Sequence, residues 1–198
     1  NRKHSDIFEY DKDTDPVLLD EYCKEAEFVF HLAGVNRPKE QSEFMEGNFG
    51  FTSILLDKLK KYNNTCPVML SSSIQAKLDN PYGESKKAGE DLLFAYSNET
   101  GAKVLVYRFP NVFGKWCRPN YNSAVATFCY NIAHGIPITV NDPNVVMNLV
   151  YIDDVVEELI NALNGKENTV GYFCEVPVVH TITLGEIVDL IYSFKNSR

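Results

Sequence analysis

The chain has 198 residues, of which 44% are hydrophobic and 23% charged, and these proportions predict a single globular domain or slightly less than one. Its net charge of −8 argues against nucleic acid as a main partner, although a few placed cations can still bind an anionic small ligand. No apolar run is long enough to cross a membrane, and no signal peptide is visible. The five cysteines show no C-x-x-C spacing, which predicts reduced thiols in a cytoplasmic protein, and the four scattered histidines predict no metal site.

Strand and helix signals alternate through the first part of the chain. They predict strands at residues 7–10 and 28–32, a helix from Pro16 to about Ala26 with Asp15 as its N-cap, and a long helix at 41–62. A strand, a helix and a strand with short connections indicate a parallel βαβ unit.

The stretch LSSSIQAKLDNPYGESKKAGE, residues 70–90, carries the strongest chemical signal. Serines 71–73 follow the end of a buried strand, and Pro81 can begin a helix on which Tyr82 and Lys86, four residues apart, share a face. A nearby ammonium favours the phenolate and lowers the tyrosine pKa, so that Tyr82 can exchange a proton with an alcohol oxygen. A serine hydroxyl can hold the same oxygen. The pattern predicts carbonyl/alcohol redox with a nicotinamide cofactor, whereas Y-x-x-x-K alone is usually a solvated tyrosine and a surface lysine.

The second half continues with strand and helix signals and one polar, aromatic loop. The predicted elements are a strand at 103–108, a loop at 115–123, a helix at 123–134, a short strand at 138–140, a helix from about 152 to 163, a last strand at 171–174 and a final helix opened by a capping box at 183–186.

Several strings together resemble those of the extended short-chain dehydrogenase/reductases, the NAD-dependent epimerase/dehydratase family. They are FVFHLAGVNRP (28–38), GNFGFTSILLDKL (47–59), the S-S-S and Y-G-E-S-K pair, RFPNVFG (108–114) and NLVYIDDV (148–155). The resemblance implies an α/β fold with a Rossmann-like, doubly wound parallel sheet and a small C-terminal substrate subdomain. The glycine fingerprint G-x-x-G-x-x-G is absent, so we expect a sheet that lacks its first βα unit and a chain that binds cofactor poorly by itself.

The resemblance also assigns residues over a single domain, 1–198, in which 1–114 mainly binds cofactor and 115–198 mainly binds substrate. The implied catalytic residues are Ser73, Tyr82 and Lys86. The implied cofactor-binding residues are Lys12, Leu32, Ala33, Gly34, Ser71, Tyr82, Lys86, Phe109 and Pro110. The implied substrate-binding residues are Ser73, Asn111, Trp116, Arg118 and Tyr121, with an ordinary surface loop as the alternative for the last three.

Three further positions stand out against the family pattern. Asn48 matches an asparagine that supports a water relay to the lysine, with a helix-surface amide as a nearly equal alternative. His31 is interpreted as a packed strand residue and not as a catalyst. Met147 stands where many members have an arginine for the diphosphate, which shifts phosphate binding to Arg118 or to another residue.

Strings such as LSSSIQA, KWCRPNYNS and TLGEIVDL are similar to the reductase domain of capsular-polysaccharide synthesis enzymes. That similarity implies reduction of the C4 ketone of a UDP-2-acetamido-2,6-dideoxy-hexos-4-ulose on the route to UDP-N-acetyl-L-fucosamine, a C-terminal cupin domain in the full-length protein, and a homodimer. NADPH is favoured over NAD through Lys12, beside Asp11. The alternatives are a UDP-sugar 4-epimerase or 4,6-dehydratase, and a catalytically silent binding module. The dehydratase is disfavoured because no acid pair follows Ser73.

Overall fold

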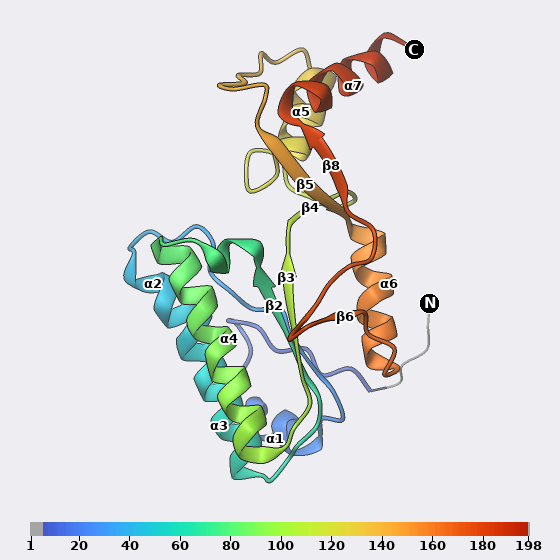
Figure 1. Cartoon of the computed structure of the whole chain (residues 1–198). Helices are drawn as coiled ribbons and strands as arrows, with labels where there is room; N and C mark the ends of the chain where they lie inside the picture. The colour runs from blue at the N-terminus through green and yellow to red at the C-terminus, as the bar shows by residue number, and fades with distance from the viewer. Residues whose placement is uncertain (1–5, 198) are drawn as a thin grey trace. The chain divides into compact units, whose positions relative to one another are not determined.

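The computed structural model describes residues 6–197, which divide into two compact units, within Asn1–Arg108 and Phe109–Arg198. Both units mix helices and strands (Figure 1), and parallel strand pairs occur in each, which confirms the predicted α/β class. The predicted division at residue 114, between mainly cofactor-binding and mainly substrate-binding residues, stays a prediction. Among the described residues, no helix combines the length and apolar character that crossing a bilayer requires.

The first unit holds most of the predicted βα elements. They are α1 (Leu18–Glu25), β1 (Val29–His31), α2 (Ser42–Met45), the π-helical segment η1 (Glu46–Gly50), α3 (Phe51–Lys61), β2 (Val68–Ser73), the 3-10 helix η2 (Ile74–Lys77), α4 (Pro81–Thr100) and β3 (Val104–Phe109), whose last residue opens the second unit.

The sheet of the first unit runs in the order β1-β2-β3. β1 and β2 are parallel, with Val29 opposite Val68 and His31 opposite Leu70. Helices α3 and α4 lie on the same side of β2 and β3 (Figure 1), and their leucines 59 and 93 are fully buried together with Val68. Burial on both faces explains why β2 begins as a continuous apolar run instead of alternating.

The two helix starts differ in how they match the prediction. The predicted start at Pro16 with Asp15 as N-cap is wrong, because α1 begins at Leu18 with Val17 as an N-cap that has no side-chain hydrogen bond, while Asp15 Oδ1 accepts from the Val17 amide at 3.0 Å in the preceding turn. Asn80 caps α4 by accepting from the Gly83 amide at 2.8 Å, with Pro81 as its first residue. α4 then continues to Thr100.

Two predicted strands are wrong, and the strands at Asn111–Phe113, Val146–Tyr151, Thr169–Val170 and His180–Thr183 were missed. Residues 7–10 and 138–140 have no regular structure. Strands need a ladder partner, and Phe8 instead stacks its ring on Tyr22 at 4.7 Å between centroids, while Ile7 stays 70% exposed. The strand at 171–174 is not the last, because His180–Thr183 forms β8.

The second unit is built around a three-stranded sheet in the order β4-β5-β8. Its elements are β4 (Asn111–Phe113), α5 (Ala124–Ala133), β5 (Val146–Tyr151), α6 (Ile152–Leu163), β6 (Thr169–Val170), β7 (Phe173–Cys174), β8 (His180–Thr183) and α7 (Leu184–Asn196). β4 is parallel and β8 antiparallel to β5, and α5 and α7 pack a core of Phe128, Ile132, Leu149 and Ile187. The predicted capping box, Thr183 with Glu186, is confirmed at the start of α7.

Candidate active site

Tyr82 and Lys86 lie on one face of α4, as their spacing predicts. The Lys86 ammonium is 5.9 Å from the centre of the Tyr82 ring. The beginning of α4 sits directly against η2, because a Cβ on Gly83 would lie 2.4 Å from the carbonyl oxygens of both Gln75 and Leu78. The short connection between the serine strand and α4 therefore packs tightly beneath Tyr82.

The three serines divide between the two faces of β2, since side chains alternate along a strand. Ser72 is buried and donates its hydroxyl to Glu90 Oε1 at 2.5 Å. Ser73 has a side-chain hydrogen bond with Tyr82 and also accepts from the Gln75 amide at 3.2 Å. Of the three hydroxyls, that of Ser73 acts on the pKa of Tyr82, and that of Ser72 makes a structural contact.

The surroundings of Tyr82 correct the expectation that Lys86 lowers its pKa. Burial raises the pKa of Tyr82 above its ordinary value, and the hydrogen bond with Ser73 acts in the opposite direction but more weakly. Tyr82 is therefore a neutral phenol near neutral pH, which is the form that can donate a proton.

The side chain of Lys86 is buried and extends from α4 to the loop that follows β1. Its side chain reaches the Ser71 carbonyl oxygen, to which Nζ donates at 3.2 Å, and burial lowers its pKa to about 8 while Glu90 opposes that change. A Cβ on Gly34 would lie 2.8 Å from Lys86 Nζ and equally close to Asn48 Oδ1. Only glycine leaves both side chains in place at this strand exit.

Asn48 is a buried positioning group, so the helix-surface interpretation is wrong. It is 4% exposed and lies within the π-helical segment, a distortion that is frequent at functional sites. Its amide accepts from Val35 N and donates to Val35 O, both at 2.9 Å, and donates to Ser85 Oγ at 3.0 Å. The side chain thus joins the loop after β1 to the first turns of α4.

His31 is a packed strand residue, as interpreted from the sequence. Its Nε2 lies 2.8 Å from Thr52 Oγ1, and that hydroxyl donates to the Asn48 carbonyl at 2.7 Å. Because the Thr52 hydroxyl hydrogen is used in the bond to the Asn48 carbonyl, His31 Nε2 must be the donor to Thr52 Oγ1. Burial, and then the charge of Lys86, lowers the pKa of His31 to about 4.

The predicted cofactor residues of the first unit lie in two places. Residues 32–34 are exposed at the carboxyl end of β1, beside Lys86, where parallel strands of this kind present ligand sites. The Lys12 side chain is 88% exposed, and Asp11 instead accepts from the Asp13 amide and the Thr14 hydroxyl, at 2.9 Å and 3.0 Å. The hydrogen-bonding groups and open backbone near Lys86 fit the ribose side of a nicotinamide cofactor.

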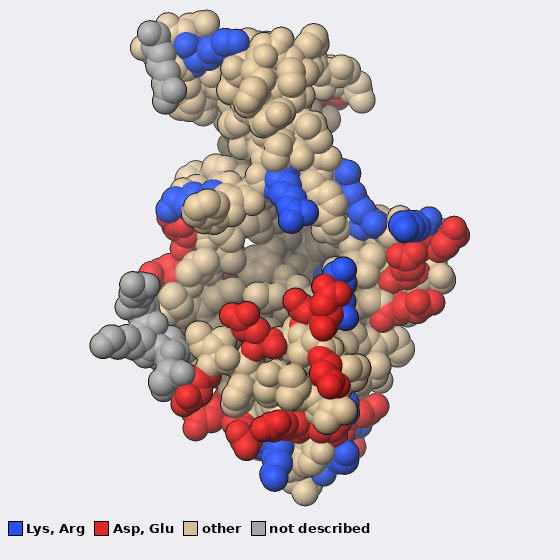
Figure 2. All heavy atoms as spheres, turned by 180° about the vertical axis from the view of Figure 1, so that it is seen from behind, with Lys and Arg blue, Asp and Glu red and all other residues tan. Residues whose placement is uncertain are grey.

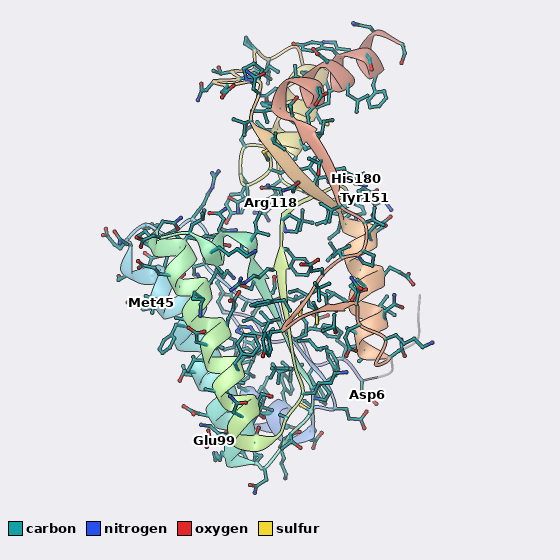
Figure 3. The ribbon with its side chains drawn as sticks, viewed as in Figure 1. Asp6, Met45, Glu99, Arg118, Tyr151 and His180 are labelled. Carbon is teal, nitrogen blue, oxygen red and sulfur yellow. The ribbon has the colours of Figure 1, made fainter. Side chains whose placement is uncertain are left out.

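The second unit contains the remaining candidates and a cavity of about 1660 Å³ between α5, α7 and the sheet. Tyr151 and His180, which lie close together in Figure 3, line it together with Lys115. The four predicted substrate residues of this unit, Asn111, Trp116, Arg118 and Tyr121, are not among its lining residues, and Trp116 is 95% exposed. Phe109, Pro110 and Asn111 also belong to this unit.

Lys115 was missed by the sequence reasoning, although it directly follows the RFPNVFG string. Its ammonium pairs with Asp153 at 2.6 Å and lies 6.0 Å from the centre of the Tyr151 ring. Its place on the cavity wall makes it a second candidate cation for a phosphate, beside Arg118. Among the described residues, no group of His, Cys, Asp and Glu side chains could hold a metal ion.

Residues 2–172 match the NAD dependent epimerase/dehydratase family. The chain belongs to this family. It is 45% identical over 181 residues to the UDP-2-acetamido-2,6-beta-L-arabino-hexul-4-ose reductase of Pseudomonas aeruginosa, covering 91% of this chain and 48% of that protein. It is 30% identical over 196 residues to UDP-glucuronate 4-epimerase 4 of Arabidopsis thaliana, covering 85% of this chain and 44% of that protein.

Among solved structures, the chain is similar to the capsular polysaccharide assembling protein CapF of Staphylococcus aureus. The TM-score is 0.83 at 50% identity, covering 93% of this chain and 50% of that one. The chain therefore spans about half the length of CapF and of the curated reductase.

Proposed function

We propose that this chain is the reductase part of an enzyme that uses NADPH to reduce the C4 ketone of a UDP-2-acetamido-2,6-dideoxy-hexos-4-ulose, in the formation of UDP-N-acetyl-L-fucosamine for a capsular polysaccharide. The observation that carries the proposal is the group formed by Ser73, Tyr82 and Lys86, in which the Ser73 side chain acts on the pKa of Tyr82 and the Lys86 ammonium lies 5.9 Å from the centre of the Tyr82 ring. The identity to a UDP-sugar reductase over most of the chain supports it.

In the proposed reaction, the residues of this chain hold the ketone and supply its proton. Ser73 donates a hydrogen bond to the C4 oxygen, and Tyr82, neutral because its pKa is raised, gives that oxygen a proton as negative charge develops. Lys86, Tyr82 and Ser71 hold the cofactor together with residues 32–34. When bound, the nicotinamide supplies the hydride.

NADPH is the proposed cofactor because of the different surroundings of Asp11 and Lys12. Asp11 is engaged in the turn through Asp13 and Thr14, whereas the Lys12 side chain is 88% exposed. Its pairing with Asp13, at 3.7 Å, is a surface contact of little strength. A cation in this position favours the 2′-phosphate of NADP over the free ribose hydroxyls of NAD.

The UDP-sugar is proposed to bind through the second unit. Asn111, Trp116, Arg118 and Tyr121 remain the proposed substrate residues, to which we add Lys115. Their loop borders the cavity through Lys115, Cys117 and Pro119. A C-terminal cupin domain and a homodimer, formed through the helices within 41–62 and 81–99, complete the proposal for the full-length protein.

The test is NADPH oxidation by the full-length protein with a UDP-4-keto-6-deoxy sugar. Tyr82→Phe removes the proton donor and should lower kcat by about 10²–10⁴-fold with little change in KM. Tyr172→Phe, which removes the same hydroxyl from an 85% exposed ring, should leave both constants unchanged. A folded wild-type protein without NADPH oxidation, or a Tyr82→Phe variant as active as wild type, contradicts the proposal.

A UDP-sugar 4-epimerase is the second candidate, because the chain is 30% identical to UDP-glucuronate 4-epimerase 4 over 85% of its length. An epimerase uses the same serine, tyrosine and lysine but returns the hydride to the sugar. Tightly retained NAD in the purified full-length protein, with interconversion of UDP-sugars and no net NADPH consumption, would identify that activity.

A further inference from the structure

Glu90 is a completely buried carboxylate one helical turn beyond Lys86 on α4. It accepts a hydrogen bond from Ser72 Oγ at 2.5 Å, and two more from Arg108, from Nε at 2.8 Å and from a terminal nitrogen at 2.5 Å. Ser72 belongs to β2 and Arg108 to β3. A single carboxylate therefore ties the helix that carries Tyr82 and Lys86 to two strands of the sheet.

The serine that Glu90 holds lies between the two residues of β2 that face the candidate active site. The Ser71 carbonyl accepts from Lys86, and Ser73 hydrogen-bonds Tyr82. Because side chains alternate along the strand, an anchor on Ser72 from one face sets the position of its neighbours on the other. The bidentate contact with Arg108 fixes the carboxylate itself, since two parallel hydrogen bonds restrict its orientation.

Glu90 also has an electrostatic relation to Lys86. Three charged or titratable groups act on or contact Lys86: His31 from β1, and Tyr82 and Glu90 from α4 itself. Two neutral groups also lie near its ammonium, the Ser71 carbonyl of β2 and the Asn48 amide of the π-helical segment. Among these groups, Glu90 brings the negative charge and opposes the effect of burial on the lysine.

We propose that Glu90, held by Arg108, is a positioning residue for the reaction: it keeps the serine strand in place against Tyr82 and Lys86, and its negative charge lies one helical turn from Lys86 on the same helix. The inference rests on the proposed reductase function and deepens it. Glu90 acts through Ser72 and Lys86 and touches neither substrate nor cofactor.

The test begins with Glu90→Gln in the full-length protein. Glutamine keeps the size and one accepting oxygen but removes the charge, so the Lys86 ammonium loses its support. We expect kcat to fall by about tenfold, the KM for the UDP-sugar to change less, and the alkaline limb of the kcat/KM profile to move to lower pH by about one unit. Asp91→Asn, which removes an exposed carboxylate on the next residue, is the matched control.

A double variant separates charge from architecture. Glu90→Gln alone removes the carboxylate that pairs with the partly buried Arg108 guanidinium, which can destabilise the fold. Glu90→Gln/Arg108→Gln removes both charges and should recover stability. The proposal expects its alkaline limb to stay displaced, because Lys86 still lacks the negative charge. A double variant with the wild-type pH profile would mean that Glu90 is only a structural partner of Arg108, and would overturn the proposal.

A readout that needs no turnover distinguishes this proposal from the proposed function. The titration of Lys86 can be followed by NMR of labelled lysine side chains, assigned with Lys86→Arg. A lower Lys86 pKa in Glu90→Gln than in wild type supports the positioning role even in a protein that turns out not to reduce a ketone. An unchanged Lys86 titration overturns it even in an active reductase.

Discussion

Tyr82, Lys86 and Ser73 are each held by a residue from another part of the first unit. Ser73 belongs to β2 and contacts Tyr82 on α4, Lys86 reaches back to the Ser71 carbonyl, and Asn48 joins the loop after β1 to α4. Such a group has few ways to rearrange, because moving one side chain breaks contacts in a second element. Preorganisation of this kind is what proton transfer at a fixed distance requires.

The buried histidine of β1 makes the stability of the protein depend on pH. The pKa of His31 is lowered from 6.5 to about 4, so the unfolded chain binds more protons than the folded one between these values. Stability contributed by neutral His31 is therefore complete above about pH 6.5 and is lost as the pH falls towards 4, by up to about 3 kcal/mol.

We predict that His31→Gln reduces this acid sensitivity. A glutamine amide can still donate to Thr52 but cannot titrate. Urea unfolding at about pH 7 and about pH 4.5 should show a smaller loss of free energy of unfolding in the variant than in wild type, by about 2–3 kcal/mol. His134→Gln, at an exposed histidine, should keep the wild-type difference. Equal acid sensitivity in all three proteins would show that His31 is not held neutral.

The junction between η2 and α4 decides where the catalytic helix begins. Gly83 allows this approach, since a Cβ there would meet two backbone oxygens at 2.4 Å, and backbone atoms cannot move aside as a flexible side chain can. The same helix ends at Gly101, which has a φ of 76° and where an added Cβ would meet no atom within 4 Å.

We predict that the two helix-end glycines respond differently to alanine. Gly83→Ala should cost about 3 kcal/mol of stability and displace Tyr82, because the helix must move off η2. Gly101→Ala should cost about 1 kcal/mol, which is the strain of a left-handed backbone alone, and should leave activity intact. Denaturant unfolding and NADPH oxidation, measured on both variants, check this. Equal losses of activity would contradict the proposed role of the junction.

Across the whole molecule, acidic side chains outnumber basic ones, 27 to 19, and Figure 2 shows many of them on one face with smaller groups of lysine and arginine. An anionic cofactor must therefore be bound by placed amides and cations and not by the overall field. In folds of this class, the pyrophosphate lies at a glycine-rich loop and the following helix N-terminus. The 198 residues contain no G-x-x-G-x-x-G string.

We predict that NADPH binding requires that glycine-rich unit. Titration calorimetry should detect NADPH binding by a chain extended at its N-terminus with a strand–loop–helix carrying G-x-x-G-x-x-G, and little or none by the 198-residue chain. Lys12→Ala in the extended chain should weaken NADPH binding and leave NADH binding unchanged. No binding by the extended, folded chain would favour the binding-module alternative over the reductase.

Local signals in the sequence determined the helices whose ends carry capping residues or a terminating glycine. Asn80 and Pro81 start α4, Gly101 ends it, and the Thr183–Glu186 box starts α7, because caps and left-handed glycines act within a few residues. The spacing of Tyr82 and Lys86 likewise placed both on one face. Family strings carried the assignment of the fold, since each marks a strand exit or helix start.

Only the tertiary structure decided which neighbours those residues meet. The strands predicted at residues 7–10 and 138–140 do not form, because strand formation depends on a partner strand elsewhere in the chain. The pKa of Tyr82 rises because the surrounding fold buries it, an effect that outweighs the nearby charge expected from sequence. The contacts of Glu90 with Ser72 and Arg108 join residues 18 positions apart in either direction, so no local pattern predicts them.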